Sequence, residues 1–96
     1  MSSPAPDTLE RNVRVLNRYG IHARPAALLV KAAAGFPDTE IFIRKGDFAV
    51  NAKSIMGLLT LEGHHGLDLV LSASGPRAAE ALDALETLFR NKFHEE

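Results

Sequence analysis

The spacing of apolar residues changes at Ser74-Gly75-Pro76, and this change constrains the fold more than any other feature of the chain. Before it, residues 67–73 place apolar side chains at every second position, which predicts a strand with one buried face. After it, the apolar residues of 77–93 recur every three or four positions, which predicts a helix with one apolar stripe. They are Ala78, Ala81, Leu82, Leu85, Leu88, Phe89 and Phe93. A strand and a helix that are each apolar on one side indicate a layered domain with a shared core.

The rest of the chain contains further elements of these two kinds. We predict strands at 9–17, 40–44 and 48–51, a helix at 24–34 and a short helix that begins at Ser54. Pro25 and Gly35 flank the first helix in the usual order, with proline inside its start and glycine past its end. The predicted order is β-α-β-β-α-β-α. It implies an α+β domain in which a four-stranded antiparallel sheet carries three helices on one face.

Length and charge limit what such a domain can do. A chain of 96 residues can bury one core, so we expect a single domain at 9–96 and a flexible tail at 1–8, which is rich in proline, serine and alanine. Eleven lysines and arginines against twelve acidic residues leave a net charge of −1, which argues against binding to nucleic acid or an anionic membrane. The lack of cysteine excludes disulfides and thiolate zinc sites.

The chain also lacks a segment that would span a membrane. The longest apolar run, Ala26–Val30, is far shorter than the roughly 20 residues that a spanning helix needs. The N-terminus has neither a basic start nor an apolar stretch, unlike a secretory signal. We therefore expect a cytoplasmic protein without membrane insertion. We also expect a monomer, because no long exposed apolar face is required.

A histidine lies where the first strand gives way to the first helix, in the segment 20–27, which reads GIHARPAA. The first amides of a helix have no carbonyl partner, and the helix dipole adds partial positive charge there. This field favours the neutral, nucleophilic form of the His22 ring. If the ring took up a phosphoryl group, the same amides and Arg24 would face the new negative charge. A histidine that merely caps the helix is the alternative that these residues leave open.

Two motifs resemble those of a known family. GIHARPAA at 20–27 and VNAKSIMGL at 50–58 resemble the signatures of the HPr family, the histidine-containing phosphocarriers of the bacterial phosphoenolpyruvate-dependent sugar phosphotransferase system. The resemblance continues at 71–75 and 81–85, so that it covers nearly everything after the tail. It implies the fold of this family, an open-faced β-sandwich of four antiparallel strands and three helices. That fold agrees with the predicted order of elements.

The resemblance also implies a function and its residues. His22 would accept a phosphoryl group at Nδ1 from phosphorylated enzyme I and pass it to an enzyme IIA domain for sugar uptake. Arg24 would stabilise the phosphate during transfer. The protein would be a carrier without turnover of its own, and not an enzyme. Phosphoryl transfer needs mainly positioning and charge stabilisation, so we expect no cofactor and no metal on this side of the reaction.

Ser54 matches the regulatory serine of the family, which an ATP-dependent HPr kinase/phosphorylase phosphorylates in some bacteria. A phosphate at this helix start would add nearly two negative charges close to the partner surface. The alternative is that Ser54 only caps the helix. By the same resemblance, the surface that docks partners would include Ala23, Ala27, Lys31, Ile55, Met56 and Leu59. On their spacing alone, the three apolar residues of the short helix could instead pack in the core.

Three other functions compete with sugar uptake. The chain could be a related carrier in a nitrogen- or carbon-regulatory phosphotransferase branch, or a module that acts only through Ser54-dependent interactions. The presence of both His22 and Arg24 argues against the second of these. An RNA-binding α/β domain shares the order of elements, but only Phe42 and Phe48 could stack on bases. We interpret His64 and His65 as surface residues of a loop, not as zinc ligands.

Overall fold

A computed structural model describes residues 8–95, so the predicted tail at 1–8 lies outside the described residues except for Thr8. The elements are β1 (Leu9–Arg14), α1 (Ala23–Ala34), β2 (Glu40–Lys45), β3 (Phe48–Asn51), α2 (Ile55–Thr60), β4 (Asp68–Ser74) and α3 (Ala78–Arg90), followed by a short 3-10 helix, η1 (Lys92–His94). Their order confirms the predicted β-α-β-β-α-β-α arrangement.

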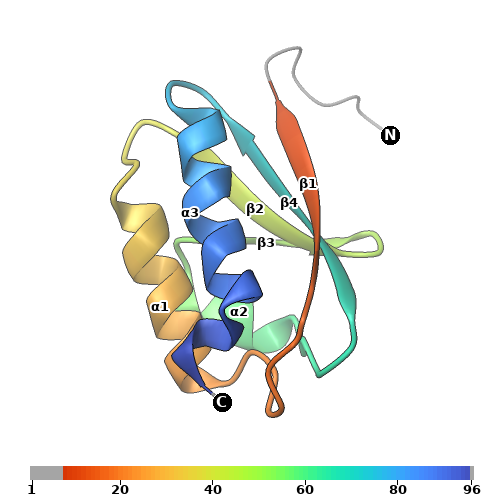
Figure 1. Cartoon of the computed structure of the whole chain (residues 1–96). Helices are drawn as coiled ribbons and strands as arrows, with labels where there is room; N and C mark the ends of the chain where they lie inside the picture. Colours follow the sequence, from red (N-terminus) through yellow and green to blue (C-terminus); the bar gives the residue numbers. More distant parts are fainter. Residues whose placement is uncertain (1–7, 96) are drawn as a thin grey trace.

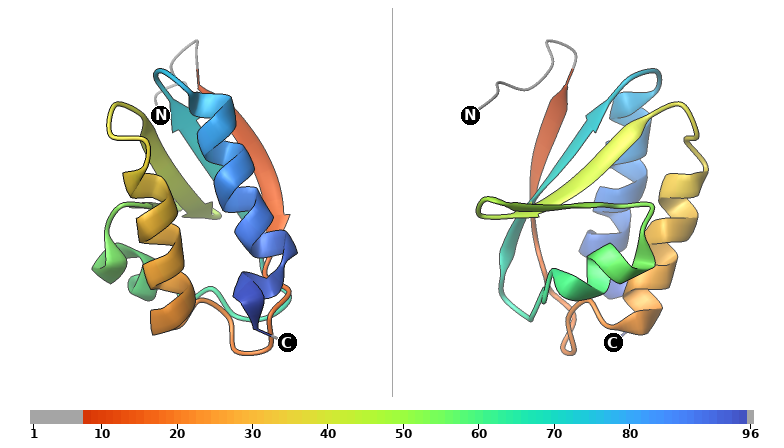
Figure 2. Two further views of the ribbon diagram at one scale, coloured as in Figure 1. Left: turned by 60° about the vertical axis from the view of Figure 1, so that its left-hand side comes forward. Right: turned by 180° about the vertical axis from the view of Figure 1, so that it is seen from behind.

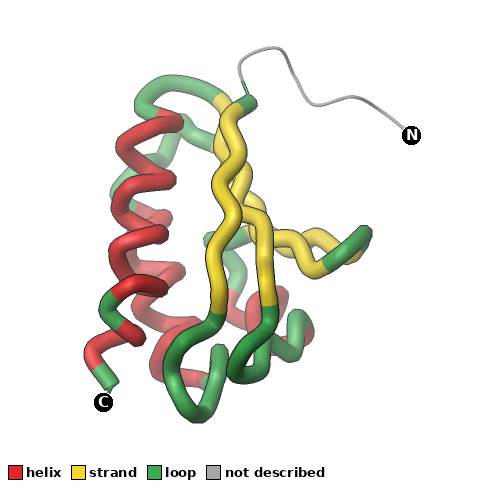
Figure 3. The backbone as a smooth tube through the Cα atoms, turned by 45° about the vertical axis from the view of Figure 1, so that its right-hand side comes forward, coloured by secondary structure: helices red, strands yellow, loops and turns green. Residues whose placement is uncertain are grey.

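The four strands form one sheet in the order β1-β4-β2-β3, and every neighbouring pair is antiparallel. Helices α1 and α3 lie side by side over one face of this sheet, and α2 contacts α1 and the edge strand β3 (Figures 1 and 2). No helix covers the opposite face within residues 8–95, as Figure 3 also shows. The predicted open-faced, four-stranded antiparallel sheet with three helices is therefore confirmed.

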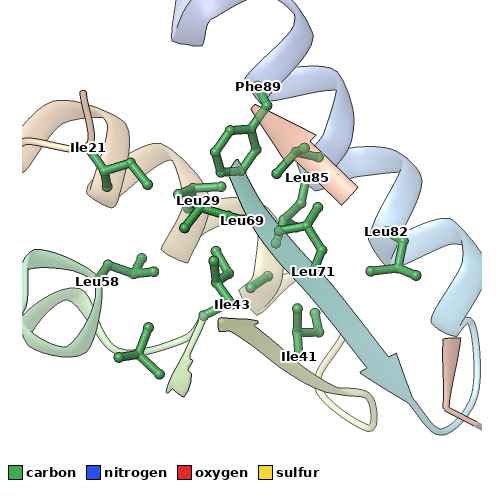
Figure 4. Packing of buried hydrophobic residues seen from close by; sticks show 14 of the residues in the cluster. Ile21, Leu29, Ile41, Ile43, Leu58, Leu69, Leu71, Leu82, Leu85 and Phe89 are labelled. Carbon is green, nitrogen blue, oxygen red and sulfur yellow. The ribbon is translucent and has the colours of Figure 1, made fainter. Parts of the chain in front are cut away.

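The core fills the space between the sheet and the helices. Val13 lies opposite Leu69 in the β1–β4 ladder, and Ile43 lies opposite Leu71 in the β2–β4 ladder. All four side chains are buried on the helix-covered face. The helices contribute Leu29, Leu58, Leu82, Leu85 and Phe89, which point into the same cluster in Figure 4. Each fully buried side chain of this size contributes about 1.5–3 kcal/mol, and together these contacts hold the helix starts in place over the sheet.

The first strand is shorter than predicted. It ends at Arg14 instead of Asn17, although Val15 still exchanges backbone hydrogen bonds with Leu67 (2.9 Å) and Gly66 (2.8 Å). Asn17 is fully buried and belongs to the turn that follows, where its carbonyl accepts a hydrogen bond from the Gly20 N–H. The chain leaves the sheet here because it must reverse direction to begin α1.

The last helix is also shorter than predicted. It ends at Arg90 instead of continuing to Phe93, and the chain then turns through η1, where Lys92, Phe93 and His94 all have positive φ. Phe93 is fully buried and packs its ring edge-on to Phe89 at 4.9 Å. This packing holds the turn and sends the chain toward the start of α1, as Figure 1 shows. No helix among residues 8–95 is long and apolar enough to cross a membrane.

Candidate functional site

His22 is the residue directly before α1, as the sequence predicts. Its backbone is extended (φ −91°, ψ −167°), and its carbonyl accepts the helical hydrogen bond from the Ala26 N–H at 3.0 Å. Its side chain makes no capping hydrogen bond to the helix and is 43% exposed. The ring therefore does not serve as a helix cap and can be reached by another molecule.

The loop before His22 fixes where the ring stands. Gly20 has a φ of +70°, and a Cβ at this position would overlap the carbonyl oxygen of Gly63. The next residue, Ile21, is buried and donates its N–H to the same Gly63 carbonyl at 2.7 Å. Only glycine allows both the left-handed backbone and this close approach of the two loops. His22 therefore follows a conformationally constrained loop, and its side chain points outward.

The surroundings of the ring are suited to an anion. The N-terminal amides of α1 lack carbonyl partners within the helix, and the positive end of its dipole lies beside His22. Arg24 is exposed in the first turn, and no described residue of that turn is acidic. Pro25 lacks an N–H but sets the entry angle of the helix. A phosphoryl group on the ring would find a positive charge and backbone donors nearby.

A carboxylate from the far end of the chain contacts the histidine. Glu95 Oε2 lies 2.8 Å from His22 Nε2, and Glu95 Oε1 accepts a hydrogen bond from Asn17 Nδ2 at 3.0 Å. The Asn17 side chain also donates to the Gly20 carbonyl at 2.7 Å. Glu95 is 15% exposed, so the contact is shielded from solvent on the glutamate side. The C-terminal segment, the loop before α1 and the histidine therefore form one hydrogen-bonded unit.

The charge state of Glu95 follows from these contacts. The hydrogen bond from Asn17 is the main cause that lowers the pKa of the Glu95 carboxyl, and partial burial opposes it. The hydrogen bond to His22, and electrostatic interactions with His22 and Arg24, lower the pKa further. The net shift is downward, so Glu95 is ionised at neutral pH. An ionised carboxylate can only accept hydrogen bonds.

A hollow lies between His22 and the loop at 62–64. It is lined by Tyr19, Ile21, His22, Glu62, Gly63 and His64. The exposed Tyr19 ring stands edge-on to the His22 ring, with 6.4 Å between centroids. His64 is an exposed loop residue, as predicted, and it lies at the rim of this hollow. Residues 8–95 contain no group of three or more His, Cys, Asp or Glu side chains that could hold a metal ion.

Ser54 is the N-cap of α2, as predicted. Its Oγ accepts a hydrogen bond from the Gly57 N–H at 3.0 Å, and its side chain is only half-buried. Ile55, Met56 and Leu59 are 40%, 70% and 39% exposed, so they do not pack in the core. Leu58 on the opposite side of α2 is fully buried.

The expected docking residues lie on two neighbouring helices, α1 and α2. Ala23, Ala27 and Lys31 are exposed along α1, and α1 packs beside α2, which carries the exposed apolar residues (Figure 2). We name the six residues Ala23, Ala27, Lys31, Ile55, Met56 and Leu59 the α1/α2 surface. This surface begins at the residue next to His22.

Sequence reasoning missed two members of the site. Asn17 falls at the end of the predicted strand 9–17, and Glu95 lies beyond the predicted helix 77–93, so neither pattern marks a site residue. No local spacing connects residue 95 to residue 22, because the contact depends on where α3 ends and how η1 turns. A signal for Asn17 does exist: it is the polar residue directly before the turn that precedes Gly20-Ile21-His22.

Comparisons with known proteins agree with this geometry. The family model described as the PTS HPr component phosphorylation site matches residues 9–91. The chain is 51% identical over 86 residues to the phosphocarrier protein HPr of Treponema pallidum, covering 90% of this chain and 97% of that one. It is 36% identical over 90 residues to the phosphocarrier protein NPr of Escherichia coli, covering 93% and 99% of the two chains.

Solved structures agree as well. The crystal structure of HPr-C-His from Thermoanaerobacter tengcongensis superposes with a TM-score of 0.87 at 43% identity, covering 92% of this chain and 98% of that one. The chain belongs to the HPr/NPr family of phosphocarrier proteins of the phosphotransferase system.

Proposed function

We propose that His22 accepts a phosphoryl group from phosphorylated enzyme I and transfers it to an enzyme IIA domain for sugar uptake. The carrier acts as a monomer and has no turnover of its own. The observation that carries this proposal is the exposed His22 ring at the positive end of α1, with Arg24 in the same turn. In this setting negative charge on a phosphorylated ring is stabilised.

Phosphoryl transfer makes few further demands on the protein. Phosphoryl transfer between two histidines requires close approach, alignment and stabilisation of charge on the phosphoryl oxygens. The α1 amides and Arg24 supply the last of these. The α1/α2 surface beside the ring supplies a place to dock, and its exposed methionine, Met56, suits a surface that fits several partners.

The test is phosphorylation by phosphoenolpyruvate and enzyme I. We expect the wild-type chain to gain one phosphoryl group that is acid-labile, measured by intact mass before and after acid treatment. His22→Ala should gain none, and Arg24→Ala should be labelled more slowly. His65→Ala removes an exposed loop histidine and serves as the matched control, which should be labelled like wild type. Labelling that persists in His22→Ala would contradict the proposal.

A nitrogen-regulatory carrier is the second candidate function. Relatives named phosphocarrier protein NPr match over nearly the whole chain, in Escherichia coli at 36% identity and in Shewanella violacea at 42% over 87 residues. The two branches differ in the acceptor that takes the phosphoryl group. Offering the phosphorylated chain a sugar-type and a nitrogen-type enzyme IIA in parallel separates them, because the true acceptor should be phosphorylated faster at equal concentration.

We further propose that phosphorylation of Ser54 regulates this transfer. The hydroxyl is half-buried at the start of α2, next to the exposed Ile55 and Met56. A phosphate there would place about −1.5 to −2 charges on the docking surface and repel a negatively charged donor. Ser54→Asp should slow labelling of His22 by enzyme I, while Ser54→Ala should not. Equal slowing in both variants would show that the helix cap, and not the charge, matters.

A further inference from the structure

We propose that Glu95 is a positioning residue for His22: its carboxylate, anchored by Asn17, holds the hydrogen on Nε2 and so leaves Nδ1 as the nitrogen that takes and gives the phosphoryl group. This inference rests on the proposed function and adds a residue to its mechanism. The residue lies near the C-terminus, 73 positions from the histidine that it contacts.

The contact determines the tautomer of the ring. Glu95 is ionised at neutral pH and can only accept, so the nitrogen that faces it at 2.8 Å must carry a hydrogen. When the ring is neutral, its second nitrogen then bears the lone pair. That nitrogen is Nδ1. A nitrogen with a free lone pair is what an attack on phosphorus requires.

A second hydrogen bond, from Asn17, fixes the position of the Glu95 carboxylate beside the ring. Asn17 is fully buried, and its Nδ2 donates both to the Gly20 carbonyl (2.7 Å) and to Glu95 Oε1 (3.0 Å). One amide group therefore ties Glu95 to the loop that sets the position of His22. The same arrangement, an acid that orients a histidine through its second nitrogen, recurs where histidines act as bases or metal ligands.

The backbone that carries Glu95 is strained. Lys92, Phe93 and His94 all adopt positive φ, a region that non-glycine residues avoid. Such a conformation persists only when surrounding contacts impose it, and it is found mainly at functional sites. Here the buried Phe93 anchors the turn on Phe89, and the turn delivers Glu95 to the ring.

Phosphoryl transfer to His22 exchanges one nitrogen–phosphorus bond for another. The Nδ1 lone pair attacks the phosphorus of the donor phosphohistidine, a new nitrogen–phosphorus bond forms, and the donor's nitrogen–phosphorus bond breaks with its electron pair returning to the donor nitrogen. His22 keeps its Nε2 hydrogen throughout. The phosphorylated ring then carries a formal positive charge, which the Glu95 carboxylate stabilises.

The same contact favours the second transfer. When the acceptor histidine attacks, the nitrogen–phosphorus bond breaks and its electron pair returns to Nδ1. A ring that keeps its Nε2 hydrogen leaves as neutral imidazole, whereas a ring without it would leave as an anion, which is far less favourable. Glu95 thus helps in both directions by keeping that hydrogen in place.

The first experiment uses the unphosphorylated protein, so that it does not depend on the proposed function. In ¹⁵N-labelled wild type at neutral to mildly alkaline pH, we expect His22 to be the Nε2–H tautomer with an Nε2–H signal protected from exchange with water. In Glu95→Ala this signal should broaden and disappear. Glu40→Gln, at the start of β2, is the matched control and should leave it unchanged. An Nδ1–H tautomer in wild type would overturn the inference.

The second experiment measures transfer rates. With a catalytic amount of enzyme I, saturating phosphoenolpyruvate and varied concentrations of the carrier, Glu95→Ala and Glu95→Gln should lower the maximal rate of labelling about tenfold, because a hydrogen bond to a charged group is lost. The KM for the carrier should not change, since the α1/α2 surface is untouched. Wild-type rates in both variants would contradict the positioning role of Glu95 but not the carrier function. A wild-type chain that gains no phosphoryl group would instead contradict the carrier function.

Discussion

At the scale of single residues, the site depends on positions where only one side chain fits. Gly20 combines a left-handed backbone with close approach to the Gly63 carbonyl, and no other residue satisfies both demands. Asn17, three positions earlier, places its amide between the Gly20 carbonyl and the Glu95 carboxylate. The position of the His22 ring therefore depends on neighbouring residues of its own loop, Gly20 and Asn17.

Gly20→Ala should be strongly destabilising. The left-handed backbone costs a non-glycine residue about 1–2 kcal/mol, and the overlap with Gly63 adds to this cost, so we expect a loss of at least about 2 kcal/mol in the free energy of unfolding. Gly46→Ala is the matched control, because Gly46 also has a positive φ (+58°) but nothing lies within 4 Å of its added Cβ. Urea unfolding of both variants gives the comparison. Equal losses would mean that the overlap is relieved without cost.

Ser54→Ala should lower the stability of the chain by about 1 kcal/mol, because the Gly57 N–H loses its acceptor. Ser54→Asp should cost much less, since aspartate is an equally good N-cap and its charge is favoured at a helix start. Thermal unfolding of the two variants beside wild type measures the difference. A Ser54→Asp chain as unstable as Ser54→Ala would show that the hydroxyl makes another contact that matters.

At the scale of elements, the periodic segments were predictable from sequence and their ends were not. The alternation at 67–73 and the stripe at 77–93 correctly predicted β4 and α3, because these patterns record which side of an element is buried. The end of α3 at Arg90 was not predictable, because the burial of Phe93 is compatible with either a continued helix or a turn. His22 was found through its place at a helix start, whereas Glu95 was missed because its role depends on that turn.

The connection between α1 and β2 is held by Lys53, which lies in the turn between β3 and α2. Lys53 Nζ donates to the carbonyls of Phe36 (2.8 Å) and Thr39 (2.7 Å) and thereby ties this connection to the start of α2. Lys53→Met keeps the aliphatic stem but removes both hydrogen bonds, and we expect a loss of about 1–3 kcal/mol in unfolding free energy. Lys45→Met, at the end of β2, should change stability far less. The prediction fails if the two methionine variants unfold at the same urea concentration.

At the scale of the whole molecule, the site joins segments from both ends of the chain. The loop before α1, the loop at 62–64 and the residue after η1 meet at one end of the sandwich, where Figure 1 shows the blue segment that follows α3 near the start of α1. They meet there because α1 and α3 pack side by side on the sheet. The core thus positions the proposed phosphoryl-transfer site as well as stabilising the fold.

The contact between Asn17 and Glu95 makes the free energy of unfolding depend on pH. The pKa of Glu95 is lowered in the folded chain, chiefly by the Asn17 hydrogen bond, and returns to its ordinary value on unfolding. The ionised Glu95 carboxylate therefore contributes fully to the free energy of unfolding above the ordinary carboxyl pKa. This contribution is lost as the pH falls through the lowered pKa of the folded chain. To remove the titration of the imidazole, both chains to be compared carry His22→Ala. Glu95→Gln should then lower the melting temperature at about pH 7 and have no effect in strong acid, where the glutamate is itself protonated. Because Asn17 remains in both chains, a difference that persisted in strong acid would mean that the Asn17–Glu95 contact does not depend on the carboxylate charge.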